Sequence, residues 1–129
     1  MFFIDDIEFR LIMPEIFLSR LNVYGIDKSY FNILNDNYIL KENVSEEIKY
    51  TLLSEGLSFL TGDMSETVLN NDEVINKYGQ VGAHIYYKEH LAKSLYTNNK
   101  IDKANNILKK LISELCSIRE EVYSNDRKY

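Results

Sequence analysis

The sequence predicts an all-α fold, a single-domain helical bundle of about five helices that spans residues 1–129 and ends in a long antiparallel hairpin. Apolar residues recur at helical spacing through most of the chain. The chain has one proline and five glycines, and it rarely shows the alternation of polar and β-branched residues typical of sheets with tight turns. With 45% hydrophobic and 27% charged residues, its composition is that of a folded globular protein.

Two helices are expected in the first third of the chain, after an N-terminal segment whose pattern fits either a strand or a helix. Residues 3–12 alternate like a strand, but their apolar residues also fit a helix, which we favour. Pro14 suits the first turn of a helix, and Gly25 suits its C-terminal stop. Asp27 then favours a brief capped helix that runs through Leu34.

The middle of the chain predicts an irregular segment and another long helix. Residues 35–43 are polar and rich in asparagine, so we expect them to form a loop. Ser45 is a good N-cap for a helix that continues to Leu60. A single helical turn is expected over 65–69, before the next break in the chain.

The final hairpin has the strongest pattern. Asp72 is a good N-cap for a helix over about 72–97, whose apolar residues lie on two sides, so we expect this helix to be central. An apolar seam with steps of three and four residues predicts the last helix over about 101–124. Residues 98–100 are a short polar connection, which makes the two helices antiparallel neighbours.

The sequence lacks the patterns of common catalytic and metal sites. His84 and His90 are six residues apart and therefore lie on different helix faces, and neither has a carboxylate three positions before it. Cys116 is the single cysteine and sits in an apolar helical pattern, which indicates a buried hydrophobe. We therefore expect no enzyme, no metal and no cofactor; the alternative is a small enzyme that uses one of the histidines as a base.

The same residues indicate a cytoplasmic protein. Asp5, Asp6 and Glu8 interrupt the first apolar run, so it does not resemble a secretory signal. We expect no membrane association, because uninterrupted apolar stretches are too short to span a bilayer. A lone cysteine cannot form an internal disulfide, which fits a reducing compartment.

Charge is distributed unevenly along the chain. Residues 1–75 hold 14 Asp and Glu against 5 Lys and Arg, a net charge of −9, whereas residues 76–129 hold 6 against 10, a net charge of +4. This acidic balance disfavours direct nucleic-acid binding and favours a basic protein as partner. The residues that we expect to bind it are acidic or aromatic: Glu46, Glu47, Asp63, Glu66, Asp72, Glu73, Tyr86 and Tyr87.

Two hypotheses follow. The first is a non-enzymatic protein-binding module, a small acidic inhibitor or adaptor of the immunity or anti-defence type that acts on a larger basic protein. The second is a structural helical module that self-associates, with His84, Tyr87 and Leu91 at the interface of a homodimer.

Overall fold

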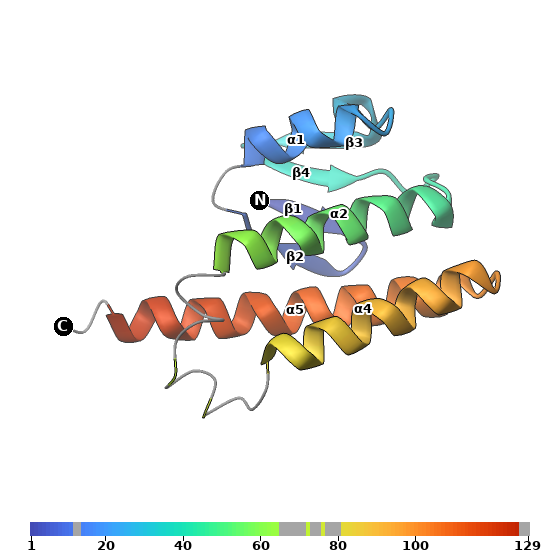
Figure 1. Ribbon diagram of the computed structural model, residues 1–129. Helices are drawn as coiled ribbons and strands as arrows, with labels where there is room; N and C mark the ends of the chain where they lie inside the picture. The colour runs from blue at the N-terminus through green and yellow to red at the C-terminus, as the bar shows by residue number, and fades with distance from the viewer. Residues whose placement is uncertain (12–13, 65–71, 73–75, 77–80, 127–129) are drawn as a thin grey trace.

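The structure is a computed structural model that describes residues 1–11, 14–64, 72, 76 and 81–126, with the backbone alone given for 63, 64 and 121–126. It combines four described α-helices with a four-stranded mixed sheet (Figure 1), so the fold is α+β and the expected all-α bundle is wrong. The helices expected after Pro14, after Ser45 and on either side of the connection at 98–100 are present, but two segments expected to be helix or loop form the sheet.

The first hairpin lies where residues 3–12 were expected to form a helix. Strands β1 (Phe2–Ile4) and β2 (Ile7–Phe9) pair antiparallel around a turn at Asp5, whose φ is 54°. Phe2, Ile4 and Phe9 are all buried on one face. The alternation therefore followed a period of two, and the helical spacing of the apolar residues was coincidental.

The second hairpin replaces the expected brief helix and the expected loop over 35–43. Asp27 does cap a turn, since its side chain accepts a hydrogen bond from the Ser29 amide at 2.9 Å, but this 3-10 helix covers only Lys28–Tyr30. Strands β3 (Phe31–Leu34) and β4 (Asn37–Leu40) follow. Asn35 and Asp36 join them with φ of 50° and 65°, the left-handed pair that a type I′ hairpin turn requires.

The two hairpins form one sheet in the order β2-β1-β4-β3. Its central pair, β1 and β4, is parallel, with Phe2 beside Tyr38 and Phe3 beside Ile39. Phe2 stacks on Tyr38 with ring centroids 4.8 Å apart. The sheet thus presents one aromatic, buried face, made by these side chains: Phe2, Ile4, Phe9, Phe31, Tyr38 and Leu40.

Helices α1 (Pro14–Asn22) and α2 (Glu46–Met64) pack on that face. Phe17 of α1 meets Phe2, Phe9 and Phe59 at ring distances of 5.1, 5.8 and 5.6 Å. The start at Pro14 is as expected, and the chain leaves α1 through Gly25, whose φ of 76° suits a glycine C-terminal stop. The Ile26 amide then donates to the Leu21 carbonyl at 3.1 Å, and both side chains are buried, which completes a Schellman motif.

Helix α2 has the expected N-cap. The Ser45 hydroxyl accepts a hydrogen bond from the Ile48 amide at 3.3 Å. Gly56 is buried in the middle of α2, where an added Cβ would lie 2.8 Å from Phe9 Cε1. A glycine at this position allows the helix to lie close to the aromatic core.

Helices α4 (Val81–Thr97) and α5 (Ile101–Asp126) form the final antiparallel hairpin (Figure 1). Asn99 takes a left-handed φ of 61° in the connection, and the Lys100 amide donates to the Leu95 carbonyl at 2.8 Å. The expected helix start at Asp72 is not tested, because 73–75 and 77–80 lie outside the described residues, as does the turn expected over 65–69.

A polar cluster joins α5 to the rest of the molecule. Asp5 accepts hydrogen bonds from Lys49 of α2 at 3.2 Å and from Lys109 of α5 at 3.0 Å. Burial by itself would raise the pKa of Asp5, but the hydrogen bonds and charges of the two lysines outweigh it and lower this pKa below its usual value. Asn105, which is 1% exposed, donates from Nδ2 to the Glu46 carbonyl oxygen at 3.0 Å and to its carboxylate at 2.8 Å.

Candidate functional site

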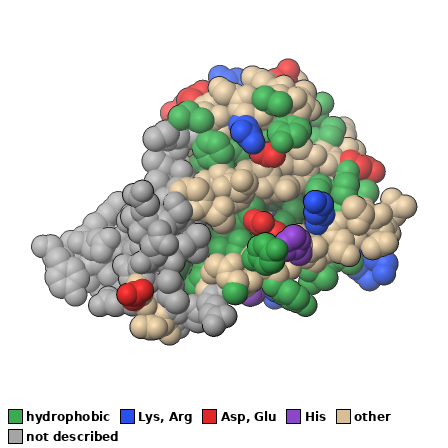
Figure 2. Space-filling view, in the orientation of Figure 1, with side chains coloured by type: hydrophobic (Ala, Val, Ile, Leu, Met, Phe, Trp, Pro, Cys, Tyr) green, Lys and Arg blue, Asp and Glu red, His purple; other side chains and the backbone are tan. Residues whose placement is uncertain are grey.

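Helix α4 presents an exposed aromatic surface, which we call the tyrosine face: Tyr86, Tyr87 and His90. Tyr86 and Tyr87 are 66% and 63% exposed, although large aromatic side chains usually bury most of their area. Tyr86 packs edge-on against the His90 ring, with centroids 4.2 Å apart. Figure 2 shows hydrophobic and histidine side chains together on this side of the molecule.

The tyrosine face is exposed because α4 uses its other side for the core. Val81, Ile85 and Ala92 are buried there. At 100° per residue, Tyr86, Tyr87 and His90 fall on the opposite side of the helix. Gly82 is exposed on the flank between the buried stripe and Tyr86, and among the described residues nothing lies within 4 Å of the position of its missing Cβ. The expectation that this helix is central is therefore wrong: α5, which packs against α4, α2 and β2, takes that place.

Glu89 borders the tyrosine face and was not singled out by sequence reasoning. It is half-buried, and burial raises the pKa of its carboxyl, with only the charge of His90 acting in the opposite direction. No ion pair to Glu89 is formed by any residue in the described part of the chain. A half-buried carboxylate of this kind is stabilised by an incoming cation.

A stacked tyrosine pair lies next to Glu89 at the junction of α2 and α4. The rings of Tyr50 and Tyr96 are 4.0 Å apart and nearly parallel, at 15°. Burial raises the pKa of the Tyr50 hydroxyl, and the nearby Tyr96 and Glu89 raise it further. Aromatic rings beside a carboxylate are the chemistry that binds the guanidinium or ammonium group of another protein.

The expected homodimer residues lie at the border between α4 and α5. His84 Nε2 is 3.2 Å from the Glu114 carboxylate, and both side chains are about half exposed. Tyr87 is exposed and Leu91 is half-buried. These three side chains share one strip of α4, as expected, but His84 also makes this contact to α5, next to a cavity of about 630 Å³ lined in part by Val81 and Ile118.

The structure describes only part of the acidic set that was expected to form one docking surface, so this prediction is not tested as a whole. Glu46 is bound by Asn105 and by Lys49, the latter at 3.3 Å, whereas Glu47 is exposed. Asp63 is about 24 Å from Glu47 along α2, at 1.5 Å per residue. Asp72 is exposed. Among the remaining positions, Glu66, Glu73 and the side chain of Asp63 lie outside the described residues.

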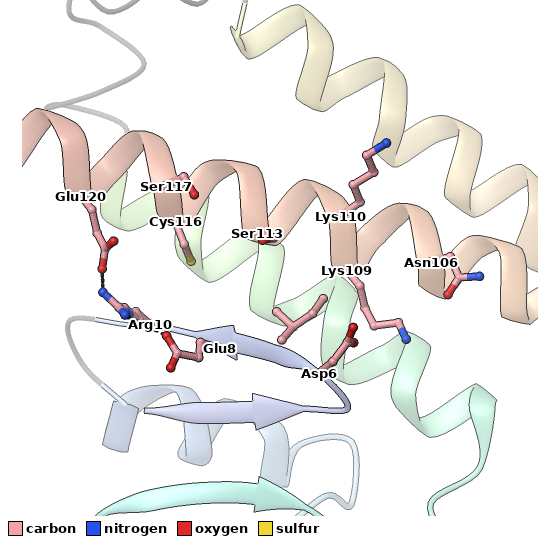
Figure 3. A pocket seen from close by; sticks show the side chains of 11 residues that line it. Asp6, Glu8, Arg10, Asn106, Lys109, Lys110, Ser113, Cys116, Ser117 and Glu120 are labelled. Carbon is pink, nitrogen blue, oxygen red and sulfur yellow. Dashed lines mark hydrogen bonds and ion pairs between the residues drawn. The ribbon is translucent and has the colours of Figure 1, made fainter.

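A charged groove of about 570 Å³ runs between β2 and α5 (Figure 3). Arg10 forms ion pairs with Glu120 and with Glu8, the latter at 2.8 Å. Cys116 lines the groove and is buried, as the sequence indicates, and burial raises the pKa of its thiol, against a hydrogen bond from the Arg10 backbone. A thiol in this state is a poor nucleophile, and the charged residues around it neutralise one another.

The described part of the chain shows neither a metal-binding cluster nor a membrane-spanning helix. No three or more His, Cys, Asp or Glu side chains are arranged there to hold a metal ion. No described helix combines the length and the hydrophobicity needed to cross a membrane. Comparisons with protein-family models, with curated proteins and with solved structures find no match to this chain.

Proposed function

We propose that this chain is a non-enzymatic protein-binding module of the cytoplasm, a small acidic inhibitor or adaptor that docks onto a larger basic protein. The observation that carries the proposal is the tyrosine face, with two tyrosines more than 60% exposed beside a half-buried carboxylate. Tyrosine is enriched among residues that dominate binding energy, because it combines apolar area with a hydroxyl and few rotatable bonds.

Two charge features support a basic partner. The chain carries a net charge of −5, which attracts a basic protein over long range and raises its association rate. At short range, an arginine or lysine of the partner would neutralise Glu89 and lie against Tyr86. Glu47 and Asp72 are exposed and add to the long-range attraction.

Site-specific photocrosslinking tests this proposal. A photoreactive phenylalanine analogue is placed at Tyr86, at Tyr87 and, as a control, at Val23, which is 78% exposed in the turn that follows α1. We expect a basic protein to be crosslinked from native cells at the two α4 positions and not at Val23. Equal crosslinking at all three positions, or none at α4, would contradict the proposal.

Affinity measurements with the captured protein then test the roles of the side chains. We expect the Tyr86→Ala, Tyr87→Ala double variant to weaken binding by on the order of 10-fold to 100-fold. Glu89→Gln should weaken it less, and should also reduce its dependence on ionic strength. Val23→Ala is the matched control and should leave the affinity unchanged.

A further inference from the structure

Strand β3 is an open edge of the sheet, and it is strongly apolar. Ile33 and Leu34 are 49% and 64% exposed, and Ile39 on the neighbouring strand is 39% exposed. The four residues Phe31–Leu34 carry no charge, proline or bulge, which are the features that keep exposed edges from pairing. An edge of this kind is a template for another strand.

The backbone groups that face this open edge can be identified from the pairing with β4. The Lys41 amide donates to the Tyr30 carbonyl at 3.0 Å, so Tyr30 directs its backbone toward β4. Since alternate residues point the same way, Asn32 and Leu34 also face β4. Ile33 therefore directs both its N–H and its C=O away from β4, toward the open edge. The C=O of Phe31 points the same way, whereas the Phe31 N–H donates to the Lys28 carbonyl within the chain.

From this pattern we infer that β3 pairs antiparallel with β3 of a second copy of this chain, centred on Ile33, to form a two-fold symmetric dimer with one continuous sheet. Ile33 would exchange two hydrogen bonds with Ile33 of the second copy, and each Phe31 carbonyl would accept from the amide of residue 35 opposite. The bound Phe31 N–H is not needed in this register.

Charge complementarity favours a second copy in this orientation. The hairpin tip that follows β3 carries Asp36, whereas the 3-10 helix that precedes it carries Lys28. An antiparallel pair places the acidic tip of each copy beside the basic start of the other, twice by symmetry. Asp27 is occupied within its own copy, because its carboxylate accepts from the Ser29 amide.

Sedimentation velocity over a range of concentrations tests the inference. We expect the mass of the native chain to rise from 15.2 kDa toward twice that value, with a dissociation constant on the order of tens of micromolar, as for a small interface. Ile33→Lys and Ile33→Glu should each remain monomeric, because like charges would lie directly opposite. An equimolar mixture of the two variants should restore the dimer.

Three results with the native chain and the Ile33 variants would overturn the inference. These are a native chain that stays monomeric throughout, an Ile33→Lys variant that dimerises as the native chain does, and an Ile33→Lys and Ile33→Glu mixture that stays monomeric. Loss of the dimer in Tyr87→Ala would also overturn it, since the interface would then lie on α4. Hydrogen exchange of the native chain is an independent readout: the Ile33 amide should exchange more slowly as concentration rises, whereas the Val23 amide should not change.

Discussion

The two edges of the sheet contain strands of similar length but face different surroundings. At the β2 edge, α5 covers the backbone: Arg119 donates to the Arg10 carbonyl at 2.9 Å, and the Arg10 amide is bound to Cys116. At the β3 edge, Ile33 and Leu34 are exposed to solvent. A covered edge contributes to folding stability, whereas an open edge is available for association. Substitutions at the two edges should therefore separate these two properties.

The largest expected difference concerns one apolar side chain at each edge. Phe9→Ala removes a fully buried ring that packs against Phe17, and we expect it to lower the free energy of unfolding by about 3–5 kcal/mol. Ile33→Ala removes a half-exposed side chain and should cost below about 1 kcal/mol. Urea denaturation at low protein concentration measures both. Equal losses would show that the β3 edge is part of the core.

Two glycines of α2 test how closely this helix packs on the core. In Gly56→Ala the new methyl group would meet the Phe9 ring, so we expect a loss of about 1–3 kcal/mol. In Gly62→Ala the added methyl group would have no described atom within 4 Å, and we expect a gain of about 0.5–1 kcal/mol, because alanine favours the helix. Thermal unfolding of both variants gives the sign. A stable Gly56→Ala variant would contradict the close packing of α2 on β2.

The turns at the two ends of the sheet provide a pH test. Asp5→Asn keeps a residue that tolerates positive φ but loses the charge that Lys49 and Lys109 bind. We expect it to lower the free energy of unfolding by about 1 kcal/mol at neutral pH, a small loss because Asp5 is one-third exposed and solvent screens its charge. The folded-state pKa of Asp5 is lowered, so its contribution is present above the unfolded-state pKa and is lost as pH falls through the folded-state value.

The stability difference between the native chain and Asp5→Asn should therefore shrink on acidification, as followed by urea denaturation from neutral pH into the acid range. Asp36→Asn, at the turn of the open edge, is the matched control: its φ is also positive, and we expect no comparable loss at neutral pH. A pH-independent difference for Asp5→Asn would mean that its effect does not come from charge.

An effect similar in size to that of Asp5→Asn is expected where α5 covers the β2 edge. Arg119→Met keeps much of the side-chain volume but removes the donor to the Arg10 carbonyl, and we expect a loss of about 0.5–1.5 kcal/mol. Native-state hydrogen exchange should show faster exchange at β2 without a change at β3. Faster exchange at both edges would indicate that the sheet responds as one unit.

The parts of the fold that sequence reasoning found are those with local signals. Pro14, Gly25 and Ser45 act as helix boundaries through contacts within a few residues, and Asn99 closes the final hairpin in the same way. The strands are three or four residues long, which is too short for a period to stand out. One usable signal was missed, because Asn35 and Asp36 are residues that tolerate the type I′ turn between two apolar runs.

The same distinction holds for the candidate site: features set by neighbouring residues were predictable from the sequence, and features set by distant residues were not. The exposure of at least one of the adjacent residues Tyr86 and Tyr87 follows from their divergence around a helix, and both prove to be exposed. The hydrogen bond that Glu46 accepts from Asn105 could not be predicted from the sequence, since the two residues are 59 positions apart. The half-burial of Glu89 likewise depends on how α4 packs, which its helical pattern does not reveal.

By itself, the sequence determined the main helices, the helix boundaries at Pro14, Gly25 and Ser45, the final hairpin and the excess of negative charge, because these depend on neighbouring residues or on composition. Only the tertiary structure decided that Phe2 lies beside Tyr38, that α5 covers β2 and that β3 is open. Strand pairing joins segments far apart in the chain, and its hydrogen bonds are made by a backbone that is the same at every residue, so side-chain patterns specify it weakly.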